Sequence, residues 1–365
     1  MDKRVVLGVD IGGSHIATAL VTVADGSVVK ESVFRQAINA RAGSDEIMEQ
    51  WTKAIEFPLS KTILSCISGI GISMPGPFDY ANGISLIRGV NKYEQLYGLN
   101  IKEQLQQKLG LDSNFPVYFE NDAFCFGMGA SRKGKASPCK NIIAITLGTG
   151  MGACFLKDGR VQKEGKGVPP QGYLYHVPFR DGIAEDYFST RWLVEQFNRL
   201  GETKVSEAKE IYDLAVDHNH PGAREIFRQF GKSLGTFLAP WMQAFDAECL
   251  ILGGNLCKAS TLFLAELIKI VEQENLSILM QIEEETELSA IAGAAMFIQQ
   301  AKASEDAATP ALNWRKSTQP LLPLTAPKAQ PAGYDIYPFH PLGSGKIFRG
   351  YASLAQWIAT QQFVL

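Results

Sequence analysis

The chain has 365 residues and a mass of 40.0 kDa, with 46% hydrophobic residues, 20% charged residues and a formal net charge of −3. This length suffices for two lobes that each bury a core, and the composition excludes a disordered or fibrous chain. The slightly negative charge provides no basic field for nucleic acid, whose phosphates are neutralised chiefly by lysine and arginine, and leaves a small neutral or anionic ligand open.

The start of the chain and its cysteines indicate a cytoplasmic protein. A strand is expected from about the fourth residue, which leaves no room for a signal peptide. No apolar run approaches the roughly 18 residues of a membrane span. The cysteines form no Cys-x-x-Cys pair and stand in apolar contexts, so we expect reduced core thiols at Cys66, Cys125, Cys139, Cys154, Cys249 and Cys257.

The first half of the chain is predicted to alternate strands with turns and helices. Apolar runs at 5–10 and 16–23 flank Gly12 and Gly13, and with the turn at 24–27 they predict a three-strand meander. A helix (45–59), a buried strand (67–73), the turn at 74–77, a second helix (101–109) and a strand (117–120) follow in order. Asn121 and Asp122 come directly after that last strand, where polar residues are well placed for a cleft.

The second half begins in the same way. Residues 141–146 and 153–156 are apolar and flank the glycine segment 147–152, and a turn follows at 157–160. The pattern therefore occurs twice, about 135 residues apart, which predicts two lobes of related topology. Helices are expected at 188–200, 207–217, 223–245, 260–274 and 290–301, and a short buried strand at 249–255 ends in glycines.

The two glycine segments are candidate phosphate loops. Phosphoryl transfer depends on positioning and charge stabilisation, so backbone amides must come close to phosphate oxygens. Glycine permits that approach and the positive φ of a tight turn. Plain hairpin turns are the alternative for each segment alone. A dinucleotide fingerprint does not fit the second segment, because it is followed by another strand and not by a helix.

Two carboxylates stand next to these features. Asp10 is placed where it could hold a hydrated Mg²⁺, and its alternative is a residue that caps a turn. Asp122 lies between an apolar strand and a helix-like segment, where it could act as general base for a sugar hydroxyl. A helix N-cap is the alternative for Asp122.

Taken together, five segments resemble the ROK family (repressor, open reading frame, kinase), a branch of the sugar kinase, actin and heat-shock ATPase superfamily. The likeness covers about residues 4–301. The segments are LGVDIGGSHI (7–16), GISMPGP (71–77), ENDA (120–123), ITLGTGMG (145–152) and LGGN (252–255). Their order makes the resemblance specific. It implies an α/β, two-lobed actin/hexokinase-like (ribonuclease H-like) ATPase fold with a cleft between the lobes.

The resemblance also implies roles for individual residues. Asp122 would be the catalytic base, and Asn121 and Gly76 would lie at the sugar. ATP with Mg²⁺, held through water by Asp10, would span the two glycine segments. The residues implied on the nucleotide side are Asp10, Gly12, Gly13, Ser14, Gly148, Thr149, Gly150, Gly253, Gly254 and Asn255.

The chain departs from the family at its Gly-Glu-x-Gly-His segment, which supplies sugar contacts. The nearest match is GYLYH (172–176), where His176 keeps its place but Tyr173 replaces the usual glutamate. The zinc motif that follows in many members has no counterpart, because 177–184 contains no cysteine, and no zinc site is expected. Glu185 matches a glutamate after that motif and is expected to reach the sugar.

Structural roles are the alternatives for these weaker candidates. His176 could be a satisfied core or turn histidine, and Glu185 an exposed helix residue. The remaining histidines are interpreted as surface or core residues: His15, His218, His220 and His340.

The predicted function is ATP-dependent phosphorylation of a hexose or N-acetylhexosamine hydroxyl, with lobe closure excluding water. A sugar-responsive repressor is disfavoured, because the first strand leaves no place for an N-terminal pair of DNA-binding helices. A catalytically weak sensor or regulator that binds sugar or nucleotide is the remaining alternative, prompted by Tyr173 and the missing zinc motif. The identity of the sugar stays open.

The expected division is an N-terminal lobe (1–123), onto which 290–302 packs back, and a C-terminal lobe (124–289). The segment 303–365 carries seven of the chain's 17 prolines and is interpreted as a linker or a wrapped arm, which could tether a further domain. The family resemblance favours a homodimer. No membrane partner is expected.

Overall fold

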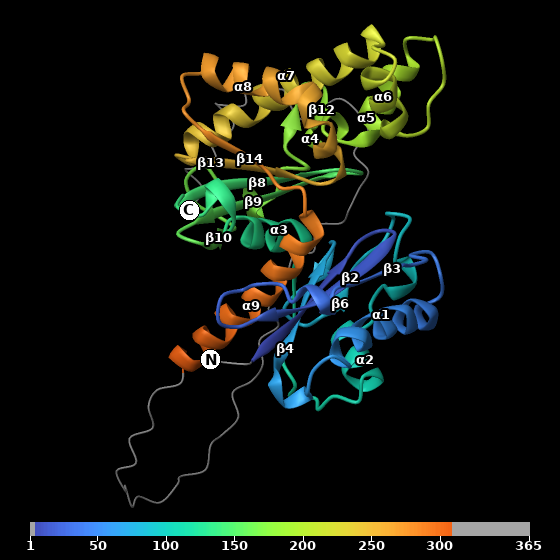
Figure 1. The fold of residues 1–365 in the computed structure, drawn as a ribbon, viewed down its shortest axis with the longest axis vertical. Coiled ribbons are helices and arrows are strands. Elements are labelled where there is room, and N and C mark those ends of the chain that lie inside the picture. Colours follow the sequence, from blue (N-terminus) through green and yellow to red (C-terminus); the bar gives the residue numbers. More distant parts are fainter. Residues whose placement is uncertain (1–3, 309–365) are drawn as a thin grey trace, which may run out of the picture.

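Two five-stranded sheets form the body of the molecule (Figure 1). The computed structural model describes residues 4–308, with side chains as far as Gln300, so that the expectations for 309–365 lie outside the described residues. The first sheet contains β1 (Val5–Ile11), β2 (His15–Thr22), β3 (Phe34–Ala37), β4 (Ile67–Met74) and β7 (Val117–Asn121). The second contains β8 (Asn141–Leu147), β9 (Met151–Lys157), β10 (Arg160–Gln162), β13 (Cys249–Gly253) and β14 (Leu279–Ile282). Two small hairpins pair β5 (Phe78–Asp79) with β6 (Ile84–Ser85), and β11 (Pro178–Phe179) with β12 (Gly182–Ile183).

The two sheets have the same topology. Their strand orders are β3-β2-β1-β4-β7 and β10-β9-β8-β13-β14. In each sheet the first three strands form an antiparallel meander and the last two add in parallel. The repeat expected from the sequence is therefore present in the sheets.

Helices cover the outer faces of both sheets, and two helices lie between them (Figure 1). In the first lobe α1 and α2 cover the outer face of the first sheet. In the second lobe α4 to α8 lie on the outer side of the second sheet. Between the sheets, α3 packs on β8 and β9, and α9 packs on α3, β1 and β4. The bounds are α1 (Ser44–Leu59), α2 (Ile101–Lys108), α3 (Asp122–Ala130), α4 (Ala184–Tyr187), α5 (Thr190–Asn198), α6 (Ala208–Val216), α7 (Pro221–Ala244), α8 (Ser260–Gln273) and α9 (Thr286–Ala308).

Glycines allow α9 to approach its neighbours backbone to backbone. A β-carbon on Gly293 would overlap the carbonyl oxygen of Cys125 in α3, and one on Gly129 of α3 would overlap that of Ser289. On the other side of α9, Gly71 of β4 faces the carbonyl oxygen of Ala294 in the same way. The small-residue pattern of α9 therefore reflects burial between two layers, because any side chain at these contacts would push the layers apart.

Three expectations differ from the structure. The helix expected at 188–200 is shorter and spans 190–198 as α5, because Phe188 and Ser189 are not helical; the short helix α4 before them was not expected. The helix expected at 290–301 is longer and continues to Ala308, so the first residues of the proposed tail are helical. Strand β14 was missed, because it is fixed by pairing with β13 across the intervening α8 and not by a local signal.

Each lobe has its own apolar core. The first surrounds Trp51 and the strands of the first sheet, and the second contains an aromatic cluster that includes Phe188, Phe230 and Phe237. The division at 123/124 stays a prediction. Within residues 4–308, none of the helices combines the length and apolar character needed to cross a bilayer.

Candidate active site

The β1–β2 and β8–β9 turns are glycine loops at the carboxyl ends of β1 and β8. In the first glycine loop (residues 12–14) the Gly12 amide donates to the His15 carbonyl over 2.9 Å, and in the second (148–150) the Gly148 amide donates to the Gly150 carbonyl over 3.0 Å. Among the described residues, no backbone acceptor is recorded for the remaining amides of either loop. A β-carbon on Gly148 would meet nothing within 4 Å. Both loops therefore present free amides, as a phosphate site requires.

Asp10 lies at the carboxyl end of β1, beside Ser73 of β4. The Ser73 hydroxyl donates to Asp10 Oδ1 over 2.6 Å. Desolvation raises the pKa of Asp10 to about 7; the Ser73 hydrogen bond opposes this shift, and the nearby carboxylates of Asp122 and Glu287 add to it. A divalent cation would relieve this crowding of carboxylates, so the residues fit a hydrated Mg²⁺.

Asp122 is the first residue of α3 and is exposed. Its Oδ1 accepts the Ala123 amide over 2.9 Å and the Asn121 side-chain amide over 3.0 Å. No partner for Oδ2 is recorded among the described residues. Gly152, which follows the second glycine loop, packs on Ala123, since a β-carbon there would lie 2.7 Å from that of Ala123. Asp122 therefore lies beside the second glycine loop, and its carboxylate is close enough to Asp10 to contribute to the raised pKa of that residue.

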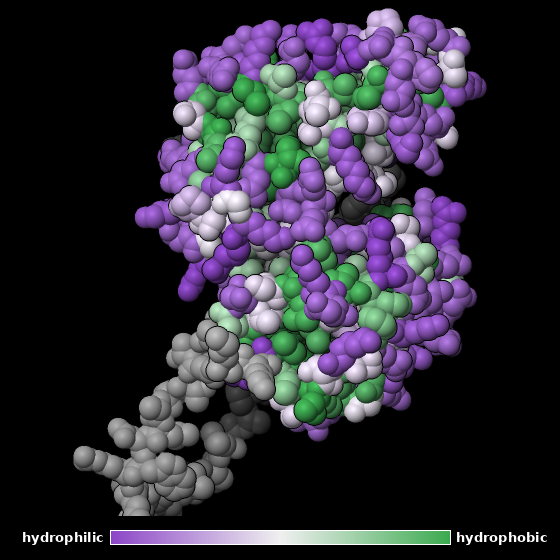
Figure 2. Space-filling view, in the orientation of Figure 1, coloured by the Kyte–Doolittle hydropathy of each residue, from purple (hydrophilic) through white to green (hydrophobic). Residues whose placement is uncertain are grey.

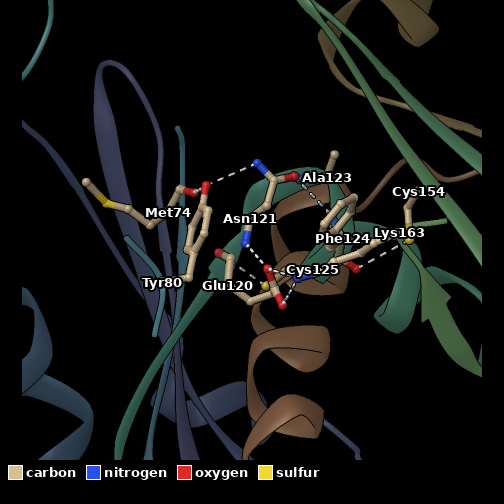
Figure 3. A network of polar contacts seen from close by, with 9 residues as sticks. All are labelled: Met74, Tyr80, Glu120, Asn121, Ala123, Phe124, Cys125, Cys154 and Lys163. Carbon is tan, nitrogen blue, oxygen red and sulfur yellow. Dashed lines mark hydrogen bonds and ion pairs between the residues drawn. The ribbon is translucent and has the colours of Figure 1, made fainter. Parts of the chain in front are cut away.

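Asn121, and not Asp122, caps α3 (Figure 3). Its side-chain oxygen accepts the amides of Ala123 and Phe124 over 3.1 and 3.4 Å. Its side-chain nitrogen donates to the Tyr80 hydroxyl over 3.3 Å, and that hydroxyl donates to the Met74 carbonyl over 3.1 Å. The alternative of an N-cap at Asp122 is thus wrong, because Asn121 occupies that position.

Gly76 lies beside this network. A β-carbon on Gly76 would come within 3.3 Å of the Tyr80 hydroxyl. Gly76, Tyr80 and Asn121 therefore form one wall next to Asp122, and Tyr80 is a member that sequence reasoning missed. A tyrosine in a loop after a strand carries no sequence signal for such a contact.

An aromatic strip leads from α3 toward the second glycine loop. Tyr173 stacks on Phe124 with ring centroids 5.3 Å apart, and Tyr175 lies edge-on to His176 at 4.8 Å. The Glu185 amide donates to the Tyr175 carbonyl over 3.0 Å, and Glu185 Oε2 accepts the Met151 amide over 3.3 Å. Desolvation lowers the pKa of His176 below its usual value. His176 and Glu185 are thus brought to one segment beside the second loop.

Lys163 and Glu120 form an ion pair at the same edge. Lys163 Nζ lies 3.1 Å from Glu120 Oε2 and 5.1 Å from the centre of the Phe124 ring (Figure 3). Neither residue was singled out for this contact from the sequence, because the pair joins segments 43 positions apart.

The glycines after β13 complete the nucleotide side. Gly253 pairs with Thr146 of β8, and the Gly254 amide donates to the Thr286 hydroxyl over 2.8 Å. Gly254 has φ +90° and lies against the Leu147 carbonyl, so a side chain there is excluded. A cavity of about 970 Å³ opens from this point, and its walls include Thr149, Val194, Tyr212, Phe227, Asn255 and Leu256.

His15 joins the first glycine loop to α9. Its Nε2 contacts Glu287 in the first turn of α9, and Arg35 contacts the same carboxylate over 2.9 Å. The sequence interpretation of His15 as a surface or core residue did not predict this cluster, because Glu287 is remote in the chain. The cluster fixes the base of the loop against the helix that lies between the lobes.

We predict that Glu287→Gln lowers the melting temperature at pH 7 and not in acid. The hydrogen bond from His15 is the main cause that lowers the pKa of Glu287 below 4.5. The ionised Glu287 carboxylate therefore stabilises the folded protein above pH 4.5, and this stabilisation is lost as the pH falls through the folded-state pKa. A loss of about 1 kcal/mol corresponds to roughly 2–4 °C. Thermal denaturation at pH 7 and below pH 4 measures it, with Glu225→Gln in the exposed pair with Arg228 as control. An equal effect at both pH values would contradict the prediction.

Among the side chains that the structure describes, residues 4–300, histidine, cysteine, aspartate and glutamate form no group of three or more suited to a metal ion. A water-mediated magnesium contact through Asp10 needs no such group. The expected lack of a zinc site stays a prediction.

The ROK family model matches residues 6–301. The chain belongs to the ROK family. The resemblance inferred from the five motifs is therefore confirmed.

Individual ROK proteins are similar at low identity. The glucokinase of Thermotoga maritima is 25% identical over 293 residues, which cover 73% of this chain and 87% of that protein. The xylose repressor of Caldicellulosiruptor bescii is 22% identical over 299 residues, covering 75% and 71%. The crystal structure of the Streptomyces griseus ROK glucokinase, in complex with glucose and AMPPNP, has a TM-score of 0.64 at 24% identity and covers 81% of this chain and 99% of that one. The two-lobed actin/hexokinase-like fold is thus confirmed, with a notch between the lobes in Figure 2.

Proposed function

We propose that this ROK protein transfers the terminal phosphate of ATP to a hydroxyl of a hexose or an N-acetylhexosamine. The proposal rests on the position of Asp122. Its carboxylate is near Asp10 at the end of β1 and is next to Ala123, on which Gly152 packs, and no partner for its Oδ2 is recorded among the described residues. Kinase relatives in the same family support it.

Asp122 is proposed as the general base. It accepts the proton of the sugar hydroxyl as the hydroxyl oxygen attacks the terminal phosphorus, and such a base must lie within hydrogen-bond reach of that hydroxyl. The Ala123 amide and the Asn121 side chain orient the carboxylate. The remaining wall, with Gly76, His176 and Glu185, is proposed to contact the other sugar hydroxyls.

The nucleotide is proposed to span both loops. Its phosphates would meet the free amides of the glycine loops, and its base and ribose would occupy the 970 Å³ cavity beyond Thr149 and Asn255. Apolar lining by Val194, Tyr212 and Phe227 suits a purine ring. Bound Mg²⁺ would neutralise phosphate charge, with Asp10 holding it through water.

The identity of the sugar substrate stays open. Tyr173 stands where the family resemblance places a glutamate, and it is stacked on Phe124 and partly buried. Tyr173 would contact the sugar through its ring and its phenol hydroxyl, where the family glutamate would use a carboxylate. Glucose, mannose, fructose, allose and N-acetylated amino sugars all remain candidates. The proposed homodimer rests on the family resemblance, and the proposed cytoplasmic location rests on the cysteine pattern.

A sensor or regulator is the second candidate function. A xylose repressor is among the relatives, and Tyr173 removes a charged sugar contact that the family pattern provides. Such a protein would bind sugar or nucleotide without turnover.

A sugar panel separates the two functions. Purified protein with MgATP is assayed for ADP release against hexoses and N-acetylhexosamines, and the same sugars are tested for thermal stabilisation. We expect one sugar both to stimulate ADP release and to raise the melting temperature. Stabilisation by a sugar without ADP release would favour the sensor, and no response to ATP or to any sugar would contradict both functions.

A further inference from the structure

A lysine lies against the first glycine loop. Lys92 is in the segment that joins β6 to the 3-10 turn η3 (Glu94–Leu96). Its Cδ is 3.7 Å from the position of a β-carbon on Gly13, and within the described residues it is the one neighbour of that position inside 4 Å. The ammonium is two bonds beyond Cδ. It is therefore within reach of a phosphate held by this loop.

The backbone on both sides of Lys92 is fixed. Tyr93 is fully buried, its hydroxyl donates to the Gly12 carbonyl, and its ring packs edge-on against Trp51 with centroids 5.3 Å apart. On the other side, the Asn91 amide donates to Glu94 Oε1 over 2.9 Å. Both Asn91 and Tyr93 have positive φ, at 58° and 56°. Tyr93 thus ties the Lys92 segment directly to the glycine loop, so Lys92 keeps its place beside it.

Other cations near the loop are already paired with carboxylates, and Lys92 is not among these pairs. His15 and Arg35 contact Glu287, and Lys163 contacts Glu120. No ion pair of Lys92 is recorded among the described residues. The loop already has the carboxylates Asp10 and Asp122 nearby, so an incoming phosphate needs a cation that is not neutralised elsewhere.

We propose that Lys92 binds the terminal phosphate of the nucleotide at the first glycine loop and stabilises its charge during transfer. The free amides of Gly13 and Ser14 and the Lys92 ammonium together provide convergent donors for one phosphate group. This inference rests on the proposed kinase function and adds a catalytic residue to it.

The step balances without further reactants. A bond forms between the sugar oxygen and the terminal phosphorus, and the bond from that phosphorus to the bridging oxygen breaks, with its electron pair leaving on ADP. The hydroxyl proton passes to Asp122. Lys92 keeps its proton and contributes charge alone, which is the main form of catalysis in phosphoryl transfer.

Nucleotide binding without sugar tests the contact directly. Calorimetry with Mg²⁺ compares ADP with a non-hydrolysable ATP analogue in the wild type, Lys92→Met, Lys92→Arg and Lys53→Met. Lys53 is an exposed α1 lysine of the same lobe, so its replacement changes the net charge equally. We expect Lys92→Met to bind ADP normally and to lose about tenfold or more in affinity for the ATP analogue. Lys92→Arg should keep most of the wild-type affinity for the analogue.

Turnover gives the second readout. Lys92→Met should lower kcat by about 10²-fold with the preferred sugar, while Lys53→Met leaves it unchanged. An unchanged ratio of analogue to ADP affinity in Lys92→Met, including an equal loss of both, would overturn the assignment of Lys92 to the terminal phosphate. If the wild type itself binds neither nucleotide, the proposed kinase function fails as well, so the two failures are distinguishable.

Discussion

Asp122→Asn is expected to lower turnover by about 10²-fold or more while sugar and nucleotide binding persist. The substitution keeps the size of the side chain and its oxygen for the Ala123 amide, but removes the charge that accepts a proton. ADP release under saturating sugar and MgATP measures turnover, and ligand-induced thermal shifts measure binding.

Asp45→Asn is the matched control for Asp122, because Asp45 is also an exposed aspartate in the first turn of a helix, in α1. Its turnover should equal that of the wild type. Near-normal turnover in Asp122→Asn would remove Asp122 from the role of base. Loss of sugar binding together with turnover would instead make Asp122 a binding residue.

Gly293→Ala is expected to destabilise the protein by about 3 kcal/mol, or on the order of 10 °C in melting temperature. Alanine normally stabilises a helix interior relative to glycine by roughly 1 kcal/mol. Here the added carbon overlaps the Cys125 carbonyl oxygen in α3, which is backbone and cannot move aside alone. The clash therefore outweighs the gain in helix propensity, and α3, which begins with Asp122, must shift.

Gly43→Ala provides the contrasting result. Gly43 precedes α1 with φ −64°, and a β-carbon there meets nothing within 4 Å. We expect a change of only a few tenths of a kcal/mol. Thermal and urea denaturation of both variants measures the difference. Equal stability of Gly293→Ala and the wild type would contradict the backbone-to-backbone contact of α9 with α3 at Gly293.

The local pattern of the chain was enough to predict most elements of both sheets. Apolar runs interrupted by glycine mark strands and hairpins because period and turn chemistry act over a few residues. The duplicated pattern around Gly12 and Gly148 predicted two lobes, and the sheets have the same strand order. The motif around Asp122 pointed to a carboxylate at a strand end, where the structure has it.

Contacts between remote segments were decided only by the tertiary structure. Strand β14, the His15–Glu287 cluster and the approach of Lys92 to Gly13 each join residues far apart in sequence, and no local propensity encodes them. The choice between Asn121 and Asp122 as helix cap depended on side-chain geometry, because both residue types suit that position. The sequence by itself thus determined the order of strands, loops and motif residues, which local periodicity and turn chemistry specify. Which of those residues meet across the lobes was determined by packing, because only the folded chain brings α9 and the 86–93 segment to the first glycine loop.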